Sequence, residues 1–349
     1  VPVDIPLPTP VELKQIFLSL ITPLQKAGKI NARIDSDLVE IVINASRGRT
    51  ENDVEHLYAK LLVRNKSYDE NDLPLVVEEK KKLIRKSGLL EYYGFSENMD
   101  SVGGLDNLKT WLRQRGLAFS QKARDFGLPE PKGLLLLGVQ CCGKSLAAKS
   151  TASLWNLPLL KLDVGKIFDS YLGSSEKNIR EAIKTAEALS PNVLWMDEID
   201  KAFSGVGGGN NGDSGASARV FGTFLTWMQE KTVPVFVLAT ANNIEHLPPE
   251  LLRKGRFDDI FFIDLPKPQE RVQIFNIHFR KRKRDPKQFQ INDFSKLTQG
   301  FTGSEIEQLI ISGLYRAFAE DREINNADVV SEIKDTVPLS VTYKAVSYT

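Results

Sequence analysis

The feature that most constrains this chain is a loop of the form G-x-x-x-x-G-K-S, which runs from Gly138 to Ser145. The apolar run Leu134–Leu137 precedes it and predicts a buried strand. Backbone N–H groups in such a loop, and the positive end of a following helix, favour a polyphosphate. Lys144 is expected to reach the β and γ phosphates, and the Ser145 hydroxyl to ligate Mg²⁺. The residues expected to contact a nucleotide here are Gly138, Val139, Gln140, Cys141, Cys142, Gly143, Lys144, Ser145 and Leu146.

A second apolar run, Val193–Met196, ends in the acid pair Asp197 and Glu198. Because ligands collect at the carboxyl ends of buried parallel strands, this pair is expected to face the same phosphates. Asp197 would hold the Mg²⁺ shell, and Glu198 would orient and polarise the attacking water. Acid pairs after a strand also mark helix N-termini. The spacing of about fifty residues after Lys144 favours an ATPase site that takes ATP and Mg²⁺.

A third run, Val235–Thr240, leads to Asn242, whose amide would hydrogen-bond the γ-phosphate or the water. Further along, Arg253 and Arg256 lie three residues apart beside Gly255. Their distance in sequence from the phosphate loop suggests charge supplied to a neighbouring site. The alternative is a pair of surface salt bridges, which usually contribute little to stability.

Five segments in this order resemble the AAA+ ATPase superfamily, in the clade with paired arginine fingers. They are Val102–Leu105, Gly138–Ser145, Val193–Glu198, Ala239–Asn242 and Leu251–Asp258. The resemblance implies an α/β fold: a P-loop core of parallel sheet flanked by helices, followed by a C-terminal helical lid. It also implies a homo-oligomeric ring, a hexamer, in which the fingers reach the adjacent subunit. The residues to which it gives roles are Val102, Gly103 and Gly303 at the nucleotide, and Lys144, Glu198, Asn242, Arg253 and Arg256 in catalysis.

Within the same region, Tyr171, Leu172 and Gly173 resemble the aromatic-x-Gly pore loop with which related rings grip a threaded polymer. A lysine that commonly precedes the aromatic residue is Ser170 here. The client would be a polypeptide or, less favoured, a nucleic-acid strand held by stacking and charge. An exposed tyrosine that anchors a loop by packing is the alternative.

Cys141 and Cys142 depart from the resemblance, because most relatives carry glycine and a small polar residue there. Replacing glycine restricts the backbone where it wraps the phosphates, so slower hydrolysis is expected. Thiols beside a helix N-terminus and a lysine are expected to have a lowered pKa, which would allow a redox-sensitive loop. Two small buried side chains are the favoured alternative. With no other cysteine in the chain, we expect a reducing compartment and no disulfide framework.

The charge balance of the chain is nearly neutral. Its 46 basic and 45 acidic residues give a formal net charge of +1, which argues against a chain-wide nucleic-acid or membrane footprint. The densest basic run, Arg280–Arg284, suits a solvated helix end, with a phosphate-binding patch as the alternative. No apolar stretch approaches the ~20 residues needed to span a bilayer.

An internal repeat is suggested by two pairs of segments. Asp4–Phe17 resembles Asp264–Phe275, and Gly48–Leu57 resembles Gly300–Leu309, in the same order. Chance similarity between two amphipathic helical hairpins is the alternative. Between the lids, Val76–Tyr93 has helical spacing and predicts a helix. The expected domains are 1–65, a lid-like remnant of an upstream degenerate module; 66–98, a linker and helix; 99–266, the nucleotide-binding core; and 267–349, the C-terminal lid and tail.

Three further phrases narrow the resemblance: Arg85–Glu91, Gly222–Trp227, and Ala241–Asn243 with Leu247–Arg256. They resemble a family of AAA proteins encoded in algal chloroplast genomes and in cyanobacteria, a family connected with photosynthesis and carbon acquisition. The resemblance implies the plastid stroma or a cyanobacterial cytoplasm. Our first hypothesis is therefore an ATP-driven ring motor or remodelling enzyme with an unidentified client. A slow nucleotide-gated scaffold and a nucleic-acid translocase are the alternatives.

Overall fold

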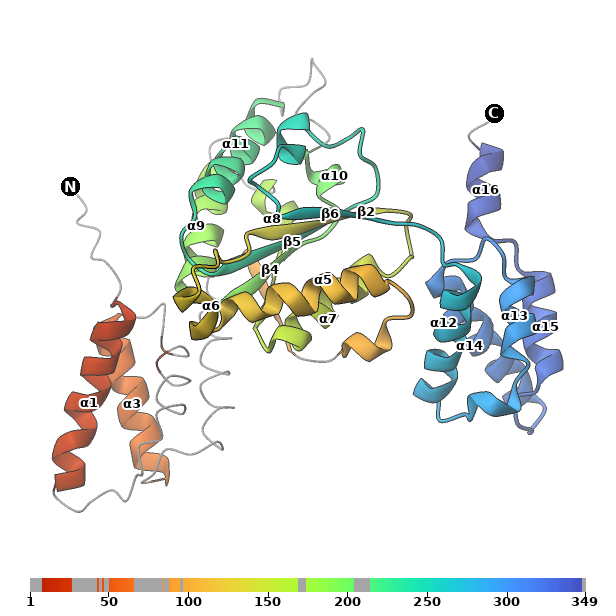
Figure 1. Ribbon diagram of the computed structural model, residues 1–349, viewed down its shortest axis with the longest axis horizontal. Helices are drawn as coiled ribbons and strands as arrows, with labels where there is room; N and C mark the ends of the chain where they lie inside the picture. The colour runs from red at the N-terminus through yellow and green to blue at the C-terminus, as the bar shows by residue number, and fades with distance from the viewer. Residues whose placement is uncertain are drawn as a thin grey trace. The chain divides into compact units, whose positions relative to one another are not determined.

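The computed structural model describes residues 8–26, 43, 46, 50–65, 84, 88–94, 97–168, 174–203 and 214–346. Within them, six strands are hydrogen-bonded in the order β1-β3-β4-β5-β2-β6, and helices flank this sheet (Figure 1), which confirms the predicted α/β class. The described residues form two compact units. The first draws on residues 1–93, 158–196 and 205–237, and the second on 94–157, 197–204 and 238–349.

The first unit contains a short strand where the sequence predicted a helix. Leu90–Tyr93 forms β1, which pairs antiparallel with β3 (Leu159–Leu162), so the predicted helix to Tyr93 is wrong over these four residues. A four-residue segment with one leucine and two tyrosines fits either structure, and pairing with a distant strand decides between them. Strand β3 pairs parallel with β4 (Asn192–Met196). The helices of this sheet region are α8 (Val164–Phe168), α9 (Ser174–Ala188) and α11 (Ser214–Glu230).

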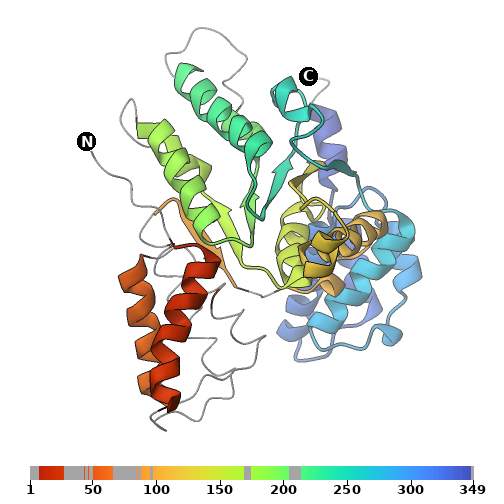
Figure 2. The ribbon, with the colours of Figure 1, turned by 60° about the vertical axis from the view of Figure 1, so that its left-hand side comes forward.

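Two N-terminal helices of the first unit, α1 (Pro10–Lys26) and α3 (Glu51–Asn65), lie side by side in both views (Figures 1 and 2). Their facing side chains are fully or almost fully buried, and the rings of Phe17 and Tyr58 meet edge to face at 5.1 Å between centroids. Apolar residues three and four positions apart on each helix produce this shared stripe.

In the second unit, β2 (Gly133–Gly138) pairs parallel with β6 (Asp259–Ile263). Strand β5 (Val235–Ala241) contributes its last four residues to this unit. All six residues of β2 are buried, as a strand covered on both faces requires. Helix α5 packs on α7 through the indole of Trp155, which donates to the carbonyl of Leu112 at 2.8 Å. The remaining elements before the lid are η2 (Met99–Ser101), α5 (Asp106–Gly116), η3 (Leu117–Phe119), α6 (Gln121–Asp125), α7 (Lys144–Trp155), α10 (Ile199–Phe203) and η5 (Pro249–Leu252).

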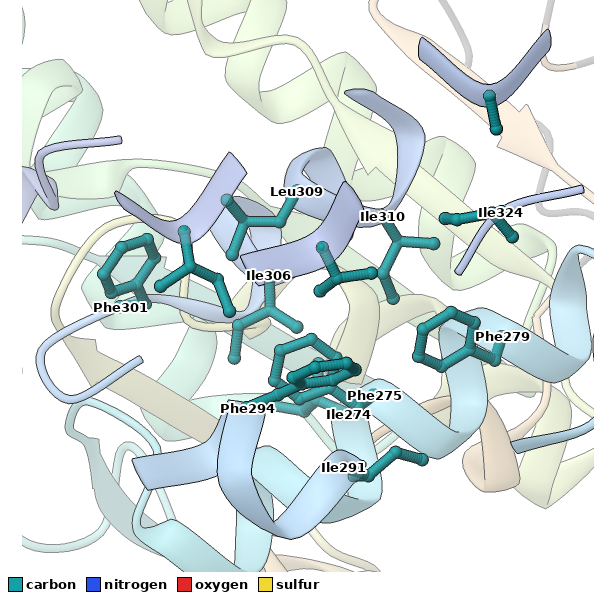
Figure 3. Close-up of a cluster of buried hydrophobic side chains, with 13 residues drawn as sticks. Ile274, Phe275, Phe279, Ile291, Phe294, Phe301, Ile306, Leu309, Ile310 and Ile324 are labelled. Atoms are coloured by element: carbon teal, nitrogen blue, oxygen red, sulfur yellow. The ribbon is translucent and has the colours of Figure 1, made fainter. Parts of the chain in front are cut away.

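The C-terminal lid of the second unit is helical and has an apolar core of its own (Figure 3). Phe275, Phe279 and Phe294 are fully buried in it. Arg271, 5% exposed, holds the base of the lid, since it donates to the carbonyls of Pro266 at 2.7 Å and Ser295 at 2.9 Å. The lid elements are α12 (Pro268–Lys281), η6 (Pro286–Gln288), α13 (Ile291–Leu297), α14 (Gly303–Ala319), α15 (Asn326–Asp335) and α16 (Leu339–Val346).

Across the part of the chain that the structure describes, every helix is too short or too polar to cross a membrane.

Candidate nucleotide site

The phosphate loop joins β2 to α7. Two of its glycines have backbone conformations that residues with a side chain disfavour. Gly138 has φ 141°, and a Cβ there would collide with the carbonyl of Ile263 on β6. Gly143 has φ 93° at the start of α7. Cys141 adopts φ 60°, a left-handed conformation that a side chain disfavours by about 1 kcal/mol. The loop is therefore a tight turn that needs glycine at Gly138 and Gly143, with strain at the cysteine.

Lys144 is 7% exposed, and burial lowers the pKa of its ammonium. Its Nζ donates to the carbonyls of Gly138 at 2.8 Å and Val139 at 2.6 Å. The chain therefore holds a desolvated cation at the centre of the loop, where its field acts at low dielectric.

Asp197 is hydrogen-bonded to the phosphate loop and to the end of the third predicted strand. Ser145 Oγ donates to Asp197 Oδ1 at 3.2 Å, and Thr240 Oγ1 donates to the same oxygen at 2.6 Å. The backbone N–H of Glu198, a residue at φ 51°, donates to Thr240 Oγ1 at 3.0 Å. Sequence analysis missed Thr240, although a hydroxyl at the end of a buried strand was a signal that could have identified it.

Glu198 has both carboxylate oxygens engaged. Its Oε1 accepts from the side-chain amide of Asn242 at 3.3 Å, and its Oε2 contacts Nζ of Lys201 at 2.7 Å. The hydrogen bond from Lys201 holds the pKa of the Glu198 carboxyl below its usual value. Glu198 and Asn242, predicted from two separate strands, therefore meet, and Lys201 is an additional partner that sequence analysis did not identify.

These groups open into a cavity of about 500 Å³ inside the second unit. Its volume falls within the ~300–1,000 Å³ typical of small-molecule and cofactor sites. The predicted residues that line it are Val102, Gly103, Gln140, Cys141, Cys142, Gly143, Lys144, Ser145, Leu146, Asp197, Glu198, Asn242 and Gly303. The lid adds residues to which sequence analysis gave no role at the nucleotide, among them Ile274, His278 and Glu307. Gly138 and Val139 border the loop through the carbonyls that Lys144 holds.

The lid is tied to the core by backbone donors of the core and of α14. The N–H of Gly104 donates to Gln273 Oε1 at 2.8 Å, and the N–H of Leu105 donates to Glu270 Oε1 at 3.3 Å. From α14, Ser304 donates its N–H and its hydroxyl to the carbonyl of Cys141, at 3.4 and 3.3 Å. The phosphate loop and the lid therefore form one continuous wall of the cavity.

Comparison with known proteins shows the family of the chain. The family model described as ATPase family associated with various cellular activities (AAA) matches residues 134–265. The AAA domain-containing protein ycf46 of Pyropia yezoensis is 47% identical over 343 residues, which is 98% of this chain and 68% of that protein. The chain belongs to this ycf46 family of AAA ATPases.

Two further ycf46 proteins have similar coverage. That of Trieres chinensis is 44% identical, with 96% of this chain and 66% of the relative aligned. That of Guillardia theta is 45% identical, with 95% of this chain and 68% of the relative aligned. The chain thus spans about two thirds of the length of these relatives. A second family model, the SpoVK-like AAA ATPase, second domain, matches residues 11–87.

His278, on α12 of the AAA lid, faces the cavity with a carboxylate beside it. Burial lowers the pKa of its imidazole, and Nδ1 lies 3.4 Å from Glu307 Oε1. Arg282 donates to the same oxygen at 2.8 Å. At neutral pH the lid therefore presents a neutral imidazole that can donate and accept a hydrogen bond.

The cysteines correct one prediction. The helix N-terminus and Lys144 were expected to lower thiol pKa values, yet burial raises the pKa of the Cys142 thiol to about 12. Desolvation of the thiolate outweighs the nearby lysine. Cys142 is therefore a neutral, inert side chain of the loop, while Cys141 is exposed.

Arg253 and Arg256 lie outside the lining of the cavity, on the segment between η5 and β6. Arg253 is exposed, whereas Nη1 of Arg256 is buried without a hydrogen-bond partner among the described residues. Asp258 fixes this segment to β2, because its Oδ2 accepts from the backbone of Lys132 at 2.7 Å and of Gly133 at 3.0 Å.

Two other predicted features have different outcomes. The pore-loop residues Tyr171, Leu172 and Gly173, with Ser170, lie outside the described residues. Of the basic run Arg280–Arg284, Arg282 pairs with Glu307, and Arg284 pairs with Glu323 at 2.8 Å. Two cations of the run are thus bound to lid carboxylates.

Proposed function

We propose that this chain binds ATP with Mg²⁺ in the cavity between phosphate loop and lid, and cleaves the terminal phosphate by hydrolysis. The observation that carries the proposal is the position of Glu198, whose carboxylate lies at the cavity within hydrogen-bond distance of Asn242. In this proposal Glu198 orients the attacking water and accepts its proton after Lys201 releases one oxygen. Asn242 fixes the direction of the carboxylate and contacts the γ-phosphate.

The loop residues have separate roles in the proposal. Lys144 and the backbone N–H groups from Gln140 to Ser145 bind the phosphates. Ser145 Oγ and Asp197 Oδ1, 3.2 Å apart, would hold Mg²⁺, and these hard oxygen donors fit that ion. When bound, the ion supplies positive charge to the β and γ phosphate oxygens. His278 and Glu307 offer polar groups to the base and ribose end of the cavity.

We further propose that Arg253 and Arg256 complete the site of an adjacent copy in a homo-oligomeric ring, a hexamer. Their place outside the lining of the cavity of their own copy supports this assignment. Such fingers contribute ~10³–10⁵ to kcat in phosphoryl transfer. The client would be a polypeptide gripped by Tyr171, Leu172 and Gly173, with a nucleic-acid strand as the alternative. The resemblance and the source organisms of the relatives suggest a plastid stroma or cyanobacterial cytoplasm, in a role in photosynthesis or carbon acquisition.

A complementation experiment tests both the hydrolysis and the sharing of sites. Glu198→Gln and Arg256→Ala are each expected to lower ATPase activity by about 10³-fold, while the former still binds a fluorescent ATP analogue. Mixing the two inactive variants should restore activity, because some junctions then combine an intact Glu198 with an intact Arg256 of another copy. Turnover by Glu198→Gln at the wild-type rate would refute the role of the glutamate. Failure of the mixture to recover would refute the sharing of sites.

A second candidate function, a nucleotide-gated scaffold that hydrolyses slowly and threads nothing, is favoured by Cys141. Its left-handed backbone at φ 60° strains the loop that must wrap the phosphates. Cys141→Gly should relieve that strain. A large rise in kcat with unchanged assembly would support the scaffold, since the natural residue would then restrain hydrolysis. An unchanged kcat would favour the motor.

We also propose that residues 1–65 are the lid of an upstream AAA-like module. The match of residues 11–87 to the SpoVK-like model supports this, as do the repeated segments. A protein extended on the N-terminal side of residue 1 would test it, by showing whether the added region binds a nucleotide of its own.

A further inference from the structure

Asp200, the second residue of α10, is a buried carboxylate with an unusual set of partners. It is 3% exposed, and its Oδ2 accepts two backbone N–H groups, those of Asn242 and Asn243, each at 3.1 Å. Its Oδ1 has no hydrogen-bond partner among the described residues. Burying a carboxylate whose second oxygen is unpaired costs free energy. The position of Asp200 and its two hydrogen bonds therefore need a physical reason.

That reason lies in where the two N–H groups are. Asn242 is the residue whose side-chain amide contacts Glu198 Oε1, and Glu198 is two positions before Asp200. A third bond, from the Glu198 N–H to Thr240 Oγ1, connects the same two segments. The three bonds form a bracket: Glu198 to Thr240, Asp200 to Asn242, and Asn242 back to Glu198.

We propose that Asp200 is a positioning residue for hydrolysis: by holding the backbone of Asn242, it fixes the Asn242 amide against the carboxylate of Glu198. This inference rests on the proposed function of the site. Asp200 does not line the cavity and would not touch the nucleotide. Its removal would therefore change the orientation of Glu198 and leave phosphate binding by Lys144 and the loop intact.

Because Oδ2 of Asp200 accepts both hydrogen bonds, one substitution can keep these bonds and another can remove them. In Asp200→Asn, the amide oxygen can replace Oδ2 and keep both bonds, with the amide nitrogen in place of the unpaired oxygen. In Asp200→Ala both bonds are lost. Asp328→Ala is the control for loss of a buried acid elsewhere in the chain: Asp328 is also 3% exposed and also accepts a backbone N–H, that of Asn325, but it lies in the lid and pairs with Arg322 at 2.6 Å. It reports what loss of a buried acid does to stability alone.

The experiment combines amide hydrogen exchange with steady-state kinetics on the full chain. Asp200→Ala should speed exchange at Asn242 and Asn243 by about tenfold or more, and lower kcat by about 10²-fold with nucleotide affinity within about twofold of wild type. Asp200→Asn should restore protection and most of kcat, and Asp328→Ala should leave both amides protected. Unchanged exchange in Asp200→Ala would overturn the bracket, as would faster exchange with an unchanged kcat. If the wild type hydrolyses no ATP, the proposed function fails, and the exchange result alone decides whether Asp200 holds Asn242.

Discussion

The N-terminal helix pair (α1 and α3) and the C-terminal helix pair (α12 and α14) use equivalent residues to build their cores. Phe17 is 2% exposed and Phe275, which follows the same Gln-Ile dipeptide, is fully buried. On the second helix of each pair, Leu57 is 3% exposed and its equivalent Leu309 is 2% exposed. The N-terminal and C-terminal helix pairs therefore pack through the same pattern of buried residues.

The helix starts of the two pairs are also capped in equivalent ways. Before α1, the N–H of Thr9 donates to Glu12 at 2.7 Å, and before α12 the N–H of Lys267 donates to Glu270 at 2.7 Å. Before α3 and α14, Thr50 and Thr302 each accept the N–H of the third helical residue at 3.3 Å. Each cap satisfies a donor that the helix start would leave unpaired.

What differs, among the residues that the structure describes, is a set of polar contacts made by the C-terminal pair. Glu270 and Gln273 accept from the core backbone at Leu105 and Gly104, and Arg271 holds the base of the lid. At the position equivalent to Arg271, α1 carries the buried Leu13. The comparison teaches that the residues that pack a helix pair are different from the residues that bond the C-terminal pair to the core.

The largest expected effect comes from emptying either core. Phe17→Ala and Phe275→Ala should each destabilise the helix pair concerned by about 3–5 kcal/mol, because a large ring is replaced by a cavity. Only Phe275→Ala should also abolish binding of a fluorescent ATP analogue. Urea unfolding measures the first effect, and titration with the analogue measures the second. Loss of nucleotide binding in Phe17→Ala would contradict the expectation that only the C-terminal pair supports the nucleotide site.

A smaller effect is expected at the contact between lid and core. Gln273→Ala removes the acceptor for the Gly104 N–H and should weaken nucleotide binding by about tenfold, the equivalent of roughly 1.4 kcal/mol. The matched control is Gln15→Ala, at the equivalent and exposed position of α1, which should leave affinity unchanged. Equal affinities in both variants would mean that the lid contact does not support the cavity.

The phosphate loop, the acid pair and Asn242 were predictable because each is a local pattern. Strands that end at the same edge of a sheet bring such patterns together, whatever the details of packing. That rule predicts that Asn242 lies near Glu198, as it does.

The rest of the site depends on contacts that no local pattern encodes. His278 and Glu307 reach the cavity from lid helices more than 130 residues after the phosphate loop, and Asp200 acts through backbone groups of a different strand. The pKa of Cys142 went the opposite way from the expectation because burial, a tertiary property, outweighed the neighbouring charge. Strand β1 was missed for the same reason, since its partner is about seventy residues away.

The caps should give a still smaller difference. Thr302→Ala and Thr50→Ala each remove one side-chain acceptor at a helix start, which costs about 1 kcal/mol. Thr302 is 1% exposed and stands next to Gly303 at the cavity, so its loss should also weaken nucleotide binding, whereas loss of the exposed Thr50 should not. Thermal unfolding with and without ATP measures both effects. A larger loss of stability for Thr50→Ala than for Thr302→Ala would contradict the burial seen here.

The smallest expected effect is on the pH dependence of the unfolding free energy. It should differ between the histidine of α12 and that of α3. Burial lowers the pKa of His278 below its usual 6.5, against Glu307 and with Arg282 and Lys281 nearby. The unfolded chain then takes up the proton first, so this contribution to stability is complete above pH 6.5 and declines as the pH falls through the lowered value. His278→Gln should reduce the loss of unfolding free energy between pH 7 and about pH 5.5. His56→Gln, on the exposed side of α3, should leave it as in wild type. If the unfolding free energies of wild type and His278→Gln depended identically on pH, the imidazole would not be desolvated in the folded lid. His278 would then not be a buried part of the cavity wall.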